Sequence, residues 1–228
     1  MGKKKCLLIQ WRRVPFATHP IPFRLMSDQL VLPHALYQSM LAHARADAPR
    51  EACGLLCGRN GRARDLLPAR NAAADPRHDY LVDAQSLLRA LDWEEDGDEL
   101  IAIYHSHPAS PPYPSAVDAA NAFYPDSVYL ILSLLQADAP ELRGFYLRPE
   151  AAFHGRKAEI LLREMPFQQV RTGLWGLHLL PDAMLPGIEL RAVAADVAFY
   201  LVFDENSGRQ PPPVRLISVQ PVAIIIQL

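Results

Sequence analysis

The chain has 228 residues, of which 50% are hydrophobic, and its 23 lysines and arginines nearly balance 25 aspartates and glutamates, for a net charge of −2. This balance argues against a nucleic-acid-binding or membrane-surface protein, and charges or prolines interrupt the apolar stretches before they reach the length of a transmembrane helix. Three cysteines do not suggest a disulfide framework, so we expect free thiols and a cytoplasmic location.

Helical and strand periodicities alternate through the middle of the chain. The predicted elements, in order, are a helix over 36–44, strands over 52–57 and 63–69, a helix over 83–91 capped by Asp83, a strand over 100–104, a short helix after 115, and strands over 128–135 and 143–147. The Asn60-Gly61 turn predicts a hairpin between the first two strands, so part of the sheet is antiparallel. The sequence therefore predicts a mixed α/β fold in which helices flank a partly antiparallel sheet.

Both ends of the chain lie outside this pattern. Residues 1–25 are basic and contain proline, and we expect a flexible extension there. Residues 26–165 form the predicted main domain. Residues 166–228 are largely apolar but carry no motif, so they could form an accessory subdomain, dock on the main sheet or mediate a homodimer.

A cluster of polar residues follows the strand predicted over 100–104. His105 and His107 are two residues apart on an extended segment, so their side chains share one face. Ser115 and Asp118 follow a Pro-rich loop, and their spacing also fits the capping box of a helix. Two imidazoles and a carboxylate are typical zinc ligands, and catalytic zinc sites keep a fourth position open. The sequence thus predicts a metal site at His105, His107 and Asp118, whether or not Ser115 also caps a helix.

The pattern His-Ser-His, seven residues, Ser-x-x-Asp, with an upstream Glu, resembles the signature of the JAMM (MPN+) metalloproteases, and in particular of their short bacterial members. Glu51, in Glu-Ala-Cys-Gly-Leu-Leu, best matches the upstream acidic residue, although alone it would be read as a strand-edge charge. The resemblance covers roughly residues 30–150.

This resemblance implies an MPN-like fold, related to the layered architecture of the cytidine deaminases, with one Zn²⁺ per chain. It implies that Glu51 acts as the general base and that Ser115 helps to bind the carbonyl oxygen as negative charge develops on it. The implied activity is that of a peptidase or isopeptidase. Its implied substrate is a ubiquitin-like or sulfur-carrier protein with a Gly-Gly tail.

Other functions are compatible with parts of the pattern. Some MPN proteins lack the metal ligands and serve as scaffolds, but no ligand is missing here. RadC-like proteins linked to DNA repair typically read His-Asn-His-Pro-Ser-Gly, whereas this chain has Ser106 and continues Pro-Ala-Ser. Ser115 as a serine-protease nucleophile lacks a Gly-x-Ser-x-Gly elbow, and the zinc-deaminase pattern is absent.

Overall fold

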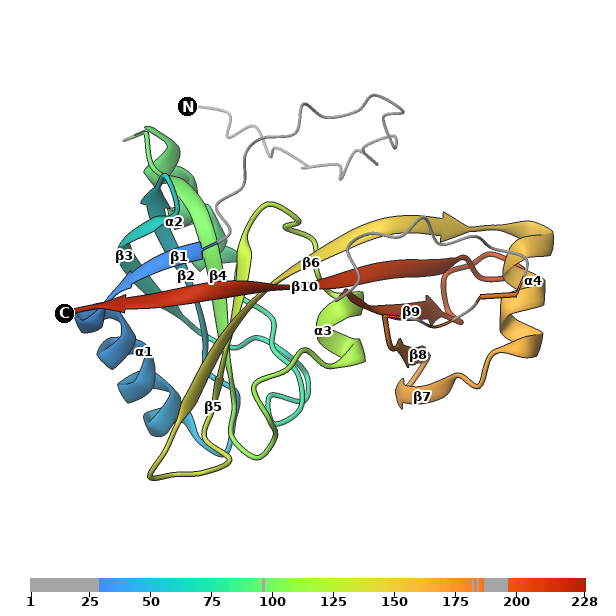
Figure 1. Ribbon diagram of the computed structural model, residues 1–228, viewed down its shortest axis with the longest axis horizontal. Helices are drawn as coiled ribbons and strands as arrows, with labels where there is room; N and C mark the ends of the chain where they lie inside the picture. The colour runs from blue at the N-terminus through green and yellow to red at the C-terminus, as the bar shows by residue number, and fades with distance from the viewer. Residues whose placement is uncertain (1–28, 96, 182, 184, 187–196) are drawn as a thin grey trace, which may run out of the picture.

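The computed structural model describes residues 29–95, 97–181, 183, 185–186 and 197–228 (Figure 1). The extension predicted over 1–25 lies outside the described residues. The elements in chain order are β1 (Gln29–Pro33), α1 (His34–Asp47), β2 (Cys53–Arg59), β3 (Arg62–Ala69), α2 (Ala84–Glu95), β4 (Glu99–His107), α3 (Ala116–Ala120), β5 (Val128–Ser133), β6 (Glu141–Phe153), α4 (Gly155–Glu164), β7 (Gln168–Arg171), β8 (Leu174–Leu179), β9 (Ala198–Asp204) and β10 (Val214–Gln227).

The strands form one mixed sheet in the order β1-β3-β2-β4-β5-β6-β10-β9-β8-β7. The part from β1 to β10 closes on itself as a barrel, because β1 pairs in parallel with β3 on one side and with β10 on the other. Figure 1 shows β6 and β10 leaving the barrel as a long two-stranded ribbon toward β9, β8, β7 and α4. The predicted mixed α/β fold is confirmed.

The barrel positions the predicted metal strand between two layers of side chains. Tyr104 of β4 lies in a buried cluster with Met40 of α1, whereas the preceding Ile103 lies in a second cluster with Ala119 of α3. Because side chains alternate along a strand, His105 falls on the α3 side. Burial on both faces explains why β4 and its neighbour β5 read as continuous apolar runs.

Local signals in the sequence are confirmed. Asn60 and Gly61 have φ of 52° and 71°, the left-handed conformation that a tight hairpin turn requires. Asp83 caps α2, since its Oδ1 accepts hydrogen bonds from the backbone N–H groups of Gln85 and Ser86 at 3.1 and 3.2 Å. The sequence did not predict β1, which precedes the first helix. Among the described residues, no helix is long and apolar enough to cross a membrane.

The C-terminal part of the chain shares a strand with the barrel. Residues 223–227 of β10 pair with β1, and residues 215–219 of the same strand pair with β9. A further hydrophobic core, separate from the two clusters on the faces of β4, lies between β8, β9, the first part of β10 and α4. It includes Leu161, Leu201 and Val214. The division of the chain into domains at residue 165 stays a prediction. One strand, β10, belongs both to the barrel and to the C-terminal part, because it pairs with β1 and with β9. We refer to α4 and β7–β9, with the first half of β10, as the C-terminal unit.

Candidate metal centre

Three predicted ligands come together at the carboxyl end of β4. His105 and His107 end this strand, and Asp118 lies on α3, which follows the Pro-rich loop. All three side chains are buried, with exposed fractions of 0%, 4% and 4%. One ligand atom from each lies within 4.8 Å of the others. The fold thus gathers two imidazoles and a carboxylate at one point.

The spacing of these atoms fits a small tetrahedral cation. The two histidine Nε2 atoms are 3.1 Å apart, and the Asp118 oxygens lie 3.4 Å from Nε2 of His105 and 3.6 Å from Nε2 of His107. Zinc–nitrogen and zinc–oxygen bonds of about 2.0–2.2 Å at tetrahedral angles separate neighbouring ligand atoms by about 3.3–3.5 Å. The three side chains therefore match the donor set and the spacing of a zinc site with one open position.

The surroundings of His107 select the tautomer that a metal needs. Its Nδ1 lies 2.8 Å from the carbonyl oxygen of Pro111, to which it donates in the neutral ring. Nε2 then carries a lone pair directed at the site, as in most metal-binding histidines. The Pro-rich loop therefore orients a ligand as well as connecting β4 to α3.

The charges of the site stabilise one another. Burial alone would raise the pKa of Asp118, but His105 and His107 outweigh it and hold the pKa of this carboxyl well below its usual range. Burial lowers the pKa of His105. Burial also acts to lower the pKa of His107, but the hydrogen bond and charge of Asp118 raise it on balance. A permanently ionised carboxylate beside two imidazoles favours a bound cation.

Ser115 is the N-cap of α3, as predicted. Its Oγ accepts a hydrogen bond from the Asp118 N–H at 3.1 Å, and its own N–H donates to Oδ2 of Asp118 at 2.7 Å. This reciprocal capping box fixes the Asp118 carboxylate relative to the backbone. Ser115 is exposed, and its hydroxyl hydrogen remains available to a ligand.

Glu51 lies two residues before the start of β2, which pairs with β4. It is 7% exposed, and burial followed by the charge of Asp118 raises its pKa from 4.5 to about 8. Its backbone is held on both sides, because its N–H donates to the Pro76 carbonyl at 2.7 Å and its carbonyl accepts from Asn71 Nδ2 at 2.9 Å. Glu51 is therefore a buried carboxyl within electrostatic reach of Asp118 and His107.

Two side chains support the site in ways that the sequence did not predict. The ring of Tyr80 stacks on His105 with a centroid distance of 4.2 Å and an interplanar angle of 15°. Ser106, between the two histidines, accepts a hydrogen bond on Oγ from the Ala52 N–H at 2.8 Å and so ties β4 to the residue after Glu51. The sequence could not predict this hydrogen bond, because Ala52 is 54 residues away from Ser106 in the chain.

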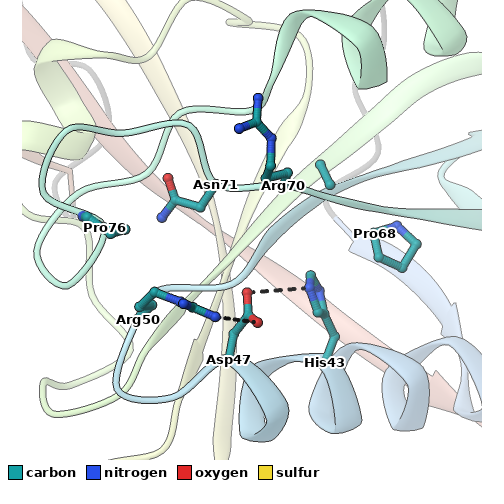
Figure 2. A pocket seen from close by; sticks show the side chains of 8 residues that line it. His43, Asp47, Arg50, Pro68, Arg70, Asn71 and Pro76 are labelled. Atoms are coloured by element: carbon teal, nitrogen blue, oxygen red, sulfur yellow. Dashed lines mark hydrogen bonds and ion pairs between the residues drawn. The ribbon is translucent and has the colours of Figure 1, made fainter.

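A separate pocket of about 600 Å³ lies beside the end of α1 (Figure 2). Figure 2 shows Asp47 between Arg50 and His43, joined to both by dashed lines. The pocket is lined by His43, Asp47, Arg50, Pro68, Ala69, Arg70, Asn71 and Pro76. None of the three predicted metal ligands lines it. His43 also packs against β4 through a 2.7 Å hydrogen bond between its Nδ1 and the Tyr104 hydroxyl.

The buried Glu51 carboxyl leads to a prediction about the metal-free protein. Because its pKa is raised by folding, a protonated Glu51 stabilises the fold below about pH 4.5, and this contribution is lost as the pH rises toward 8. Glu51→Gln stays neutral, so at pH 9 it should exceed the wild type in unfolding free energy, by on the order of 3–5 kcal/mol. Urea unfolding at pH 5 and 9 with a chelator present measures this difference. Equal pH dependence of the two proteins would contradict it.

The chain is similar to known proteins over about half of its length. Residues 33–147 match the family described as prokaryotic homologs of the JAB domain. The CysO-cysteine peptidase of Mycobacterium tuberculosis is 40% identical over 119 residues, which cover 51% of this chain and 81% of the relative. The desampylase of Haloferax volcanii is 41% identical over 119 residues, covering 48% and 84%. The solution structure of a protein from Desulfitobacterium hafniense is 38% identical, covers 51% of this chain and 83% of that one, and has a TM-score of 0.47.

Proposed function

Because the chain belongs to the family of prokaryotic JAB domains, we propose that it is a zinc-dependent peptidase or isopeptidase of the JAMM type. The observation that carries this proposal is the buried group of His105, His107 and Asp118 with a carboxyl of raised pKa, Glu51, beside it. Such a group combines a cation site with a proton acceptor that does not belong to the ligand set. Metal-assisted hydrolysis of an amide bond uses both.

His105, His107 and Asp118 would hold the ion. When bound, zinc supplies a Lewis acid that polarises a carbonyl oxygen and lowers the pKa of a water molecule toward about 7. The protein's own part is to direct Nε2 of His107 at the site and to keep the Asp118 carboxylate ionised and in place. The hydrogen bond from His107 to Pro111 and the capping box at Ser115 serve these ends.

Glu51 would accept the proton of the attacking water and return it to the leaving amine. A pKa near 8 without a cation means that the carboxyl can hold or release a proton near neutral pH. A bound cation favours the ionised form, which accepts the proton. The hydrogen bonds from Asn71 and to Pro76 hold the backbone from which this side chain extends.

Ser115 would donate a hydrogen bond to the substrate oxygen as it becomes negatively charged, and a test can separate this role from capping. Ser115→Ala removes both, whereas Ser115→Gly removes the hydroxyl but costs the helix start only a few tenths of a kcal/mol. We expect both variants to lose about 10²–10³-fold in kcat, as on removal of an oxyanion donor, and only the alanine to lose about 1 kcal/mol of stability. Near-normal kcat in Ser115→Gly would leave the hydroxyl with the capping role alone.

The proposed substrate is the C-terminal tail of a ubiquitin-like or sulfur-carrier protein that ends in Gly-Gly. The relatives named above include a peptidase that acts on CysO-cysteine and a desampylase. The ligands and Glu51 are at most 7% exposed, so only a slender segment can reach them. A Gly-Gly tail is such a segment, because glycine has no side chain that could clash with the walls of a narrow site. The cytoplasmic location, with Cys53 and Cys57 as buried free thiols, stays a prediction.

The zinc-loaded protein is expected to cleave a small carrier protein that has been extended by a few residues beyond its Gly-Gly end. Mass spectrometry should find the carrier released with Gly-Gly as its new terminus, together with the intact extension. A carrier in which the two glycines are replaced by leucines is the matched control and should remain uncut. Loss of the metal to a chelator should stop the reaction. Failure of the zinc-loaded protein to cleave either a linear or an isopeptide-linked tail would refute the proposed function.

A further inference from the structure

The C-terminal unit contacts the segments that carry the candidate site. β8 and β9 pack on α3, which Figure 1 shows between the barrel and these strands. Gly176 of β8 lies so close to the first residue of α3 that an added Cβ would come within 2.6 Å of the Ala116 Cβ. At the other end of this helix, Arg215 donates to the Ala120 carbonyl at 2.8 Å. α3 is thus contacted at both of its ends by the C-terminal unit.

One contact reaches the residue before the helix cap. Tyr200 of β9 donates its hydroxyl to the Pro114 carbonyl at 2.8 Å. Tyr200 is 7% exposed, and burial raises the pKa of its phenol, so the donor stays protonated. In α3 the first helical bond uses the carbonyl of Ser115, which accepts from the Ala119 N–H at 3.0 Å. The buried Pro114 carbonyl lies outside the helix, and Tyr200 satisfies it.

The Pro114 carbonyl and the Ser115 N–H belong to the same planar peptide group. Tyr200 holds the oxygen of this group, and Oδ2 of Asp118 accepts from its N–H at 2.7 Å. The peptide group therefore connects a phenol of the C-terminal unit to a metal-ligand carboxylate. Hydrogen bonds at the two ends of one amide polarise each other, so the first strengthens the second.

We infer that Tyr200 is a positioning residue of the catalytic site, which acts through the Pro114–Ser115 peptide group to hold the Asp118 carboxylate and the Ser115 hydroxyl in place. The C-terminal unit is then part of the apparatus that binds the metal, although it supplies no ligand. The expected effect of removing the Tyr200 hydroxyl on turnover rests on the proposed function. Its expected effects on Zn²⁺ affinity and on hydrogen exchange of the Ser115 amide do not.

Tyr200→Phe removes only the hydroxyl and tests this inference. Partners of metal ligands typically contribute 10–100-fold, so we expect the dissociation constant for Zn²⁺, from competition with a chromogenic chelator, to rise about 10-fold. The Ser115 amide should exchange its hydrogen faster in the metal-free protein. In the cleavage assay kcat should fall with KM unchanged.

Tyr129→Phe is the matched control, because the buried Tyr129 hydroxyl also bonds to backbone, accepting from the Tyr124 N–H at 3.0 Å. It should lower the melting temperature to a similar degree and leave Zn²⁺ affinity and Ser115 exchange unchanged. Wild-type affinity and exchange in Tyr200→Phe, or equal losses in both variants, would overturn the inference. If even the wild type cleaves no carrier tail, the proposed function fails, whereas affinity and exchange still decide the role of Tyr200.

Discussion

Replacement of Glu51 by glutamine is expected to lower kcat by about 10²–10⁴-fold, the contribution typical of a positioned acid–base group, while one zinc stays bound per chain. Glutamine keeps the size of the side chain and the hydrogen bonds of the Glu51 backbone, but it cannot accept a proton. The three ligand side chains are not altered. Turnover of a Gly-Gly-extended carrier, measured beside the zinc content of the same sample, tests both halves of the expectation.

Glu159→Gln makes the same chemical change at an exposed position of α4 and should behave as the wild type. The two measurements distinguish three roles for Glu51. Unchanged turnover would remove Glu51 from the mechanism. Loss of zinc together with turnover would make it a ligand, although it is not among the side chains whose ligand atoms form the compact group. Only lost turnover with retained zinc is consistent with a general base.

The parts of the fold that the sequence predicted depend on neighbours in the chain. The Asn60-Gly61 turn joins adjacent strands, and Asp83 caps the helix that follows it. The site shares this property, because His105, His107 and Asp118 lie within fourteen residues on a strand, a loop and a helix start. Short connections leave little freedom in how these elements meet, so pattern and spacing were sufficient to bring these three side chains together, while their role as metal ligands stays a prediction.

The closure of the barrel could not be predicted, because it joins the two ends of the described chain. β1 pairs with the last residues of β10, for instance Leu30 with Ile224. Pairing of strands so far apart leaves no local pattern. Nothing in the apolar run from Leu216 indicates that one half of it completes the barrel and that the other half pairs with β9.

The contacts of the C-terminal unit with the site also could not be predicted, because they join residues that are far apart in the sequence. Arg171 of β7 forms an ion pair with Asp79, and Tyr200 bonds to Pro114, across separations of more than eighty residues. A tyrosine or arginine in an apolar segment is compatible with many partners. The sequence of this unit therefore suggested a hydrophobic core and no function, whereas its packing on α3 connects it to Asp118, a proposed metal ligand.

His107→Ala and Asp118→Asn are both expected to lose the zinc and, with it, all measurable cleavage. Each removes one of three protein ligands, so affinity should fall by well over the roughly 100-fold that follows loss of a ligand's hydrogen-bonding partner. Asparagine at 118 is the more informative change, because it can still accept the Ser115 N–H and keep the helix cap. Metal analysis of the purified proteins and a chelator competition measure the loss.

His34→Ala, at an exposed position on α1, removes an imidazole that is not part of the ligand group and should keep zinc and activity. Thermal unfolding with and without zinc separates lost binding from lost folding, because a metal that binds only the folded state raises its melting temperature. That increase should be present in the wild type and in His34→Ala and absent in both ligand variants. A wild type without zinc or zinc-dependent stabilisation would favour a scaffold instead. In that case the capping box and the His107–Pro111 hydrogen bond would only stabilise the loop between β4 and α3.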